Sequence, residues 1–161
     1  MIKVLFVCLG NICRSPMAEV VLKDLVTQRG IADLFFIQSA ATSEEEIYQG
    51  IGNPVYPPAR AEMAKHGIDC GDKRAVQLTR QDYDKYDYLI GMDENNIRQM
   101  EQITGHKGGK MKRLLEYAGR DASISDPWYT RRFDVTFQDV MEGCQAFLAY
   151  LEEEGRLDGE R

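Results

Sequence analysis

Cysteine is scarce in this chain of 161 residues, which contains four: Cys8, Cys13, Cys70 and Cys144. They form no C-x-x-C pair and are too sparse for a disulfide framework, which excludes a disulfide-stabilised secreted scaffold and a cysteine-ligated zinc site. No cluster of other metal-ligating residues stands out in the sequence. We therefore expect no metal and no other cofactor, and a reducing cytoplasm as the location.

Basic residues and long apolar runs are also few. Lys and Arg number 20 against 26 Asp and Glu, which gives a formal net charge of −6. Phosphodiester backbones and anionic lipids repel an acidic chain, so neither nucleic acid nor a membrane is expected as a partner. Met1 lies directly before a predicted strand, and we expect neither a signal peptide nor a membrane span. The composition, with 43% hydrophobic and 29% charged residues, fits one domain over residues 1–161, expected to act as a monomer.

Short apolar runs alternate with segments of helical periodicity, which is typical of an α/β fold with a parallel sheet. The expected strands cover residues 2–7, 34–37, 88–90 and 111–115. The expected helices run from 14 to 30, 61 to 66, 93 to 103 and 137 to 151, and residues 40–58 are expected to form a polar loop. The sequence therefore predicts a three-layer Rossmann-like fold with a four-stranded parallel sheet, helices on both faces and a phosphate-binding loop after the first strand.

The segment between the first predicted strand and its helix has the pattern C-x5-R. The residues between Cys8 and Arg14 are Leu9, Gly10, Asn11, Ile12 and Cys13. Backbone N–H groups of such a loop can point at one anion, and the planar guanidinium of Arg14 matches two phosphate oxygens. The same groups favour a thiolate at Cys8, although a lone cysteine at a strand end is more often buried and inert. A thiolate beneath bound phosphate is a nucleophile facing phosphorus, so the pattern indicates phosphatase chemistry.

Asp126 lies far from this loop in the sequence and is followed by Pro127, Trp128 and Tyr129. The proline disfavours helical geometry at Asp126 and presents its carboxyl group on a stiff loop. An Asp-Pro pair is compatible with a simple turn. It is also compatible with a general acid, because a carboxyl group beside aromatic rings can retain the proton that a leaving phenolate needs.

These two segments carry a resemblance to a known family. Residues 7–19, Val-Cys-Leu-Gly-Asn-Ile-Cys-Arg-Ser-Pro-Met-Ala-Glu, together with residues 126–129, resemble the low-molecular-weight protein tyrosine phosphatase family, over a span from Met1 to about Leu151. The resemblance implies hydrolysis of phosphotyrosine monoesters in a protein or peptide through a cysteinyl-phosphate intermediate, with inorganic phosphate as the product. It makes Cys8 the nucleophile and Asp126 the acid that protonates the leaving group and then activates water.

The resemblance also assigns supporting roles. It implies that Ser15 hydrogen-bonds the thiolate, and that Ser39 and His66 hold Asn11 from behind the loop. It makes Cys13 a resolving thiol that captures oxidised Cys8 as a disulfide, although Cys13 can equally be a packing residue.

One departure from the family concerns the substrate slot. Many members have a tryptophan after the serine matched by Ser39, whereas this chain has residues 43–49, Ser-Glu-Glu-Glu-Ile-Tyr-Gln. We expect Trp128 and Tyr129 to form one wall of the slot and Tyr48 to substitute for the missing tryptophan on the other. The run of three glutamates is expected to be solvated.

Three alternatives remain open. An arginine phosphatase of the same fold looks similar, but has a threonine where this chain has Ile12, and an isoleucine favours an aromatic substrate. A thioredoxin-coupled arsenate reductase needs further cysteines near the third strand, where only Cys70 lies even approximately. A non-catalytic phosphate-binding adaptor is a different class, disfavoured by the intact set of Cys8, Arg14, Ser15 and Asp126.

Overall fold

Four parallel strands form the centre of the molecule. The computed structural model describes residues 1–157, and its main sheet has the order β2-β1-β5-β6. The strands are β1 (Ile2–Cys8), β2 (Phe35–Ala41), β5 (Tyr88–Gly91) and β6 (Met111–Arg113). The predicted α/β fold with a four-stranded parallel sheet is confirmed.

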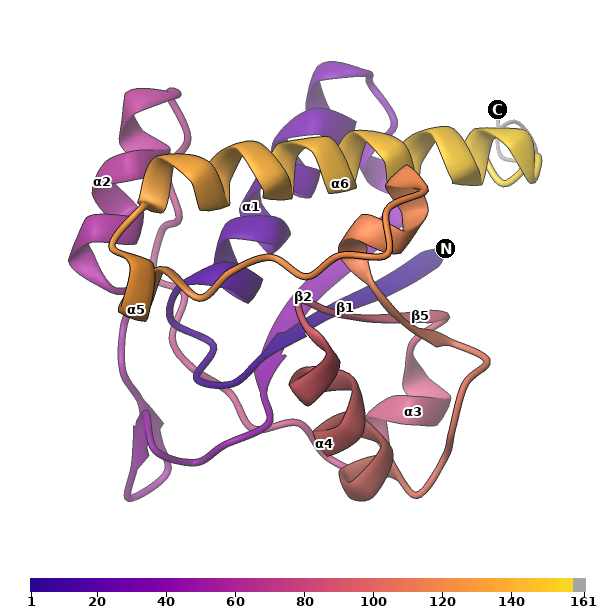
Figure 1. The fold of residues 1–161 in the computed structure, drawn as a ribbon. Coiled ribbons are helices and arrows are strands. Elements are labelled where there is room, and N and C mark those ends of the chain that lie inside the picture. The colour runs from indigo at the N-terminus through magenta and orange to yellow at the C-terminus, as the bar shows by residue number, and fades with distance from the viewer. Residues whose placement is uncertain (158–161) are drawn as a thin grey trace.

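Helices cover both faces of this sheet (Figure 1). One face carries α1 (Arg14–Gln28), α2 (Pro57–Lys65) and α6 (Phe133–Glu153), and the other carries α3 (Asp82–Lys85) and α4 (Glu94–Thr104). The alternation of β1 explains the two layers, because Val4 and Phe6 pack into the larger core cluster with α1 and α6, whereas Leu5 and Val7 pack into a second cluster on the α4 side.

Several predicted boundaries are wrong. β2 continues past residue 37 to Ala41, and α6 begins at Phe133 rather than at residue 137. The loop expected over residues 40–58 contains a small antiparallel hairpin, β3 (Ile47–Tyr48) and β4 (Ile51–Gly52), and the beginning of α2. The strand expected over 111–115 ends at Arg113, and Leu114 begins a 3-10 helix, η2 (Leu114–Ala118). Leu114 leaves the sheet to pack on α6, where a Cβ on Gly143 would lie 2.4 Å from Leu114 Cγ.

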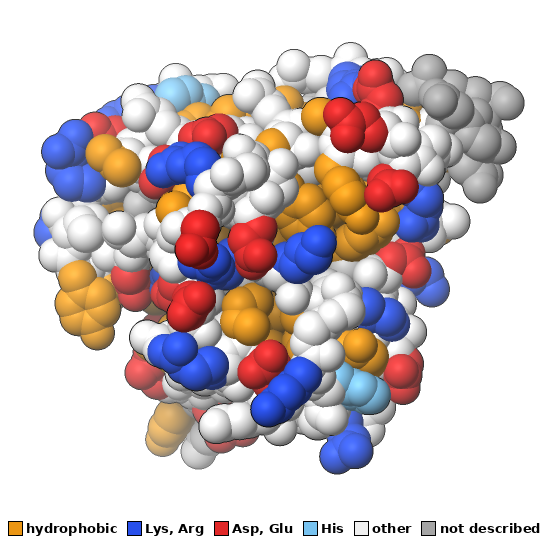
Figure 2. Space-filling view, turned by 45° about the vertical axis from the view of Figure 1, so that its right-hand side comes forward, with side chains coloured by type: hydrophobic (Ala, Val, Ile, Leu, Met, Phe, Trp, Pro, Cys, Tyr) orange, Lys and Arg blue, Asp and Glu red, His pale blue; other side chains and the backbone are white. Residues whose placement is uncertain are grey.

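Short elements not predicted from the sequence complete the chain. They are α3, η1 (Ala32–Leu34) and α5 (Pro127–Thr130). On the face drawn in Figure 2, acidic and basic side chains intermingle over the surface. Within residues 1–157, no helix combines the length and the apolar character needed to cross a bilayer.

Candidate active site

The loop that joins β1 to α1 begins with Cys8, the last residue of the strand, and ends at Arg14, the first residue of the helix. Asn11 has φ 58°, the left-handed conformation that asparagine tolerates better than most residues, and this reverses the chain into a cradle. The Asn11 backbone N–H donates to Cys8 Sγ at 3.3 Å, and Ser15 Oγ lies 3.0 Å from the same sulfur. Both groups can stabilise a thiolate at Cys8.

A buried network holds the loop from behind. Asn11 Nδ2 donates to Ser15 Oγ at 2.7 Å and to Ser39 Oγ at 2.9 Å, while Asn11 Oδ1 accepts from the backbone N–H of Val76 at 3.0 Å. The expected association of Ser39 with Asn11 is therefore present. Because every polar atom of the Asn11 side chain is engaged, the left-handed turn is fixed from three directions.

The network continues to two residues that sequence reasoning missed. Ser39 Oγ donates to Glu19 Oε1 at 2.5 Å, and Lys73 Nζ lies 3.6 Å from the same carboxylate oxygen and donates to the Ser39 carbonyl at 2.9 Å. Burial lowers the pKa of Lys73, and Glu19 opposes that effect. The available signal was Glu19 itself, an acidic residue on the buried face of α1.

His66 lies outside this network among the described residues. Its Nε2 is 3.1 Å from Glu62 Oε2, one helical turn earlier in α2, and its ring stacks on Phe137 with centroids 3.8 Å apart and planes at 4°. The predicted contact of His66 with Asn11 is not made, because the C-terminal end of α2 directs the ring toward α6.

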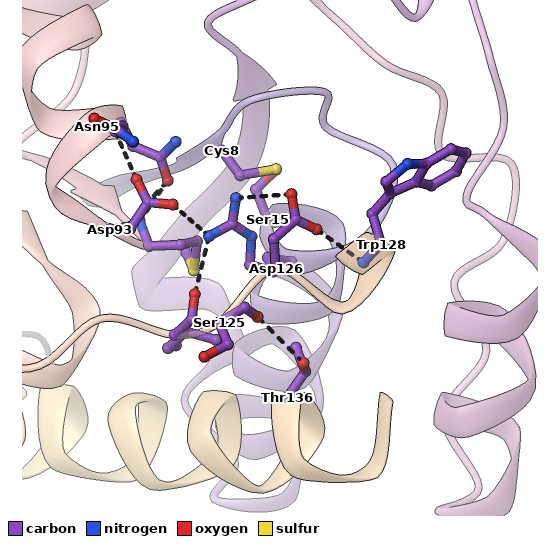
Figure 3. A network of polar contacts seen from close by, with 12 residues as sticks. Cys8, Ser15, Asp93, Asn95, Ser125, Asp126, Trp128 and Thr136 are labelled. Atoms are coloured by element: carbon purple, nitrogen blue, oxygen red, sulfur yellow. Dashed lines mark hydrogen bonds and ion pairs between the residues drawn. The ribbon is translucent and has the colours of Figure 1, made fainter. Parts of the chain in front are cut away.

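Arg14 is buried and held by three residues from two distant segments. Its Nη1 donates to Asp93 Oδ2 at 2.7 Å and to the Ile124 carbonyl at 2.9 Å, and its Nη2 lies 3.6 Å from Asp126 Oδ2. Burial by itself lowers the pKa of Arg14, but the neighbouring Cys8, Asp93 and Asp126 outweigh it and the pKa is raised. Figure 3 shows Cys8, Asp93 and Asp126 gathered around this point, with Trp128 on the outer side.

Asp126 is the N-cap of α5. Its Oδ1 accepts from the backbone N–H of Trp128 at 3.0 Å, and Pro127 occupies the first position of the helix. This cap orients the second carboxylate oxygen toward Arg14, which places Asp126 beside the cysteine loop although 118 positions separate it from Cys8.

A cavity of about 210 Å³ connects these groups. It is lined by the loop residues from Cys8 to Arg14, by Asp126, Trp128 and Tyr129, and by Glu45 and Glu46. Trp128 and Tyr129 are 48% and 78% exposed and flank the opening as expected. Tyr48 is not among the lining residues and is 76% exposed on the hairpin, so the prediction that it forms the second wall is wrong.

The opposite side of the cavity is instead acidic. Glu46 Oε1 accepts from Asn53 Nδ2 at 2.9 Å, and a Cβ on Gly10 would lie 3.1 Å from Glu46 Cγ. The hairpin turns Tyr48 outward, and the two glutamates that precede it take its place beside the cavity.

The remaining thiol of the loop is buried. Cys13 has 6% of its surface exposed, and burial, followed by the charge of Cys8, raises its pKa to about 12. All four cysteines are free. In the part of the chain that the structure describes, no three His, Cys, Asp or Glu side chains are grouped so as to hold a metal ion.

Comparison with known proteins gives a consistent result. A family model described as "Low molecular weight phosphotyrosine protein phosphatase" matches residues 3–157. The protein-tyrosine-phosphatase YfkJ of Bacillus subtilis is 38% identical over 160 residues, covering 98% of this chain and 100% of the relative. The crystal structure of YfkJ has a TM-score of 0.87 to this fold over 96% of both chains.

Two further relatives widen the comparison. The low molecular weight phosphotyrosine protein phosphatase of Rattus norvegicus is 42% identical over 155 residues, covering 90% of this chain and 92% of the relative. The crystal structure of DARP, a drosophila arginine phosphatase, is 30% identical with a TM-score of 0.83, covering 94% of this chain and 98% of its own. Because the family model and these relatives span nearly the whole chain, this protein belongs to the low molecular weight phosphotyrosine protein phosphatase family.

Proposed function

We propose that this protein hydrolyses phosphotyrosine in proteins or peptides through a cysteinyl-phosphate intermediate, with Asp126 as the general acid. The observation that carries the proposal is the convergence of Cys8, Arg14 and Asp126 on one cavity whose opening is flanked by Trp128 and Tyr129. A phosphate bound in the loop lies above Cys8, while an aromatic leaving group lies between the two rings and the acidic side.

Phosphate binding relies on the loop N–H groups and on Arg14. Asp93 and Ile124 engage Nη1 of Arg14, so the guanidinium is oriented before the substrate arrives. Nη2 has the longer contact, 3.6 Å to Asp126, and remains available to phosphate oxygens. Charge that develops on the equatorial oxygens in the transition state is then stabilised by groups that do not need to reorganise.

The reaction proceeds in two steps. Cys8 Sγ attacks phosphorus in line, the P–S bond forms as the P–O bond to tyrosine breaks, and Asp126 gives its proton to the departing oxygen. Asp126, now a carboxylate, takes a proton from water as the water oxygen attacks phosphorus and the P–S bond breaks. Ser15 and the Asn11 N–H stabilise the returning thiolate, and inorganic phosphate is released.

A reducing cytoplasm suits an enzyme that depends on a thiolate, and we propose that location, with phosphotyrosine proteins as partners of a monomeric enzyme. The test is the hydrolysis of matched phosphotyrosine, phosphoarginine and phosphoserine peptides. We expect phosphotyrosine to have the highest kcat/KM, and Cys8→Ser to lose roughly 10³-fold or more of it. Unchanged thermal unfolding and retained binding of inorganic phosphate by Cys8→Ser serve as controls.

A protein-arginine phosphatase is the second candidate. Glu45 and Glu46 beside the cavity could accept hydrogen bonds from a phosphorylated guanidinium, and DARP is 30% identical to this chain. Ile12 opposes this reading, since it adds an apolar group to the cavity lining. If kcat/KM were highest for the phosphoarginine peptide, an arginine phosphatase would become the preferred function. If none of the three peptides were hydrolysed, the result would favour a non-catalytic phosphate-binding adaptor.

A further inference from the structure

Arg131 has an unusual backbone conformation at the end of α5. It adopts φ 60° and ψ 13°, and among residues 1–157 Asn11 and Gln49 are the other non-glycine residues with positive φ. A side chain as long as arginine is disfavoured there, and such a conformation persists only where surrounding contacts determine it. The contacts of the Arg131 side chain are therefore informative.

The Arg131 guanidinium lies over two aromatic rings. Its Cζ is 5.5 Å from the ring centroids of both Tyr56 and Phe133, a distance at which a cation is attracted to a ring face. Nη1 and Nη2 also donate to Tyr56 Oη at 3.2 and 3.3 Å. The left-handed turn thus brings Arg131 onto Tyr56 from the side of α5.

Tyr56 is in turn fixed to the phosphate-binding loop. Its backbone N–H donates to the Ile12 carbonyl at 2.9 Å, and its own carbonyl accepts from Ala59 and Arg60 at 2.9 and 3.0 Å as α2 begins. Its ring packs against Trp128, with centroids 4.9 Å apart and planes at 48°. Tyr56 therefore touches the loop through its backbone and α5 through its side chain.

The position of Trp128 matters because its backbone N–H donates to Asp126 Oδ1 at 3.0 Å. Helix α5 has four residues, a single turn, and cannot hold its own orientation by internal hydrogen bonds. We propose that Tyr56 and Arg131 clamp this turn against the phosphate-binding loop, which makes Tyr56 a positioning residue for proton transfer from Asp126. The proposal rests on the function proposed above for Asp126.

The test compares Tyr56→Leu with the wild type on aryl phosphates whose leaving phenols range from acidic to weakly acidic. Weakly acidic phenols such as tyrosine need the proton of Asp126, and acidic phenols do not. We expect kcat/KM to fall about 10-fold for phosphotyrosine and less than about 2-fold for the most acidic leaving group. The inhibition constant of inorganic phosphate should stay unchanged, because it reports the loop alone.

A double-mutant cycle sharpens the result. In an Asp126→Asn background no acid remains to be positioned, so Tyr56→Leu should cause little further loss on phosphotyrosine. Tyr56→Phe keeps the ring and removes the hydroxyl that Arg131 contacts, and it should recover most of the activity. Arg131→Gly removes the side chain of the clamp and suits the left-handed backbone, so it should show the Tyr56→Leu pattern without loss of thermal stability.

The matched control is Tyr83→Leu. Tyr83 is in α3, stacks on His106 at 3.8 Å and has Lys110 Nζ 4.7 Å from its ring, a cation-aromatic group that does not line the cavity. The Tyr83→Leu variant should show the same dependence of kcat/KM on the leaving group as the wild type. Equal losses by Tyr56→Leu on all leaving groups, additive losses in the double mutant, or a weaker inhibition by phosphate would each overturn the positioning role. An inactive wild type would instead refute the proposed function.

Discussion

The two carboxylate oxygens of Asp126 have different partners. Oδ1 accepts the Trp128 N–H at 3.0 Å and Oδ2 lies 3.6 Å from Arg14 Nη2. The N-cap of α5 uses Oδ1, so a proton on Oδ2 does not break it. Asp126 can therefore gain and lose a proton without a change in the fold of its turn.

Replacing this residue with its isostere gives the first residue-scale prediction. Asp126→Asn keeps a cap acceptor but has no acidic proton to give, so kcat/KM for phosphotyrosine should fall roughly 10²-fold or more. Aryl phosphates with very acidic leaving groups should lose far less, as measured by steady-state kinetics on both substrates. A uniform loss on all leaving groups would assign Asp126 to binding or structure instead.

The second residue-scale prediction concerns the oxidation of Cys8 and the role of Cys13. We expect peroxide to convert the Cys8 thiolate to a sulfenic acid, which the Cys13 sulfur then attacks to form a disulfide and release water. The charge of Cys8 contributes to the raised pKa of Cys13, and oxidation removes that charge and favours the attack. After one peroxide dose and a thiol reductant, Cys13→Ser should recover roughly half the wild-type activity or less.

The control for this experiment is Cys70→Ser. Cys70 is also a buried free thiol, but it does not line the cavity, so its replacement should leave recovery as in the wild type. Bound phosphate should protect the wild type and Cys13→Ser from inactivation by peroxide, because it covers Cys8. If Cys13→Ser recovered its full activity, Cys13 would have no resolving role and would be a packing residue.

At the scale of elements, the segment before the hairpin brings negative charge to an anion-binding cavity. The Ser43 N–H donates to the Leu9 carbonyl at 2.9 Å, and the Asn53 N–H donates to the Glu46 carbonyl at 2.8 Å, so both ends of the segment are attached. Glu45 and Glu46 consequently stay beside the cavity. They should favour peptides with basic residues next to phosphotyrosine and oppose acidic ones.

The corresponding variant is Glu45→Gln/Glu46→Gln. It should raise kcat/KM for an acidic phosphotyrosine peptide about 3- to 10-fold at low ionic strength, and the gain should shrink in high salt as charges are screened. Glu44→Gln is the matched control, since Glu44 belongs to the same acidic run but does not line the cavity. An equal effect of Glu44→Gln would indicate the net charge of the molecule rather than the position of the two glutamates.

Long periodic elements could be predicted from the sequence, and short ones could not. β1 and α6 bury continuous apolar patterns, which determine their type locally. The hairpin has two residue pairs, and Gly52 packs so closely on the Ala75 backbone that a Cβ would lie 1.9 Å from the Ala75 carbonyl oxygen. This contact depends on a residue 23 positions further along the chain, so the local secondary-structure propensity cannot predict it.

The same reasoning separates the predicted from the missed residues of the site. Cys8 and Arg14 are close in sequence, and the strand and helix around them fix their relation. Asp93 and Tyr56 reach the loop from other elements and look like ordinary surface or turn residues in the sequence, as does Lys73, which supports the network behind the loop. His66 was assigned by resemblance, whereas in the structure Lys73 contacts the Glu19 and Ser39 side of the network.

For the molecule as a whole, buried thiols and phenols set the response to alkaline pH. Burial raises the pKa of Cys13 from 9.0 to about 12 and that of Tyr86 from 10.0 to about 12, and it raises the pKa of Cys144 and Tyr117 as well. The unfolded chain releases these protons at ordinary pKa values, so above about pH 9 it binds fewer protons than the folded protein. Stability is therefore complete below pH 9 and falls as pH rises toward 12.

The measurement is thermal unfolding between pH 8 and 10.5, over which Tm should fall by roughly 5 °C or more. Tyr86→Phe removes a titrating group that is 4% exposed and should make the decline shallower. Tyr129→Phe changes a tyrosine that is 78% exposed and should follow the wild type. A flat profile in the wild type would mean that the buried groups ionise in the folded protein without cost.

The contacts of Arg14 also determine when the enzyme becomes active during its synthesis. The Ile124 carbonyl that orients this arginine is 110 positions further along the chain, and Asp126 follows it. β1 itself lies between β2 and β5, so it is paired on both sides only after both of these later strands have been made. Before the segment around Ile124 and Asp126 emerges from the ribosome, a nascent chain therefore has Cys8 but no oriented Arg14 and no Asp126, and we expect no phosphatase activity until this segment has been made.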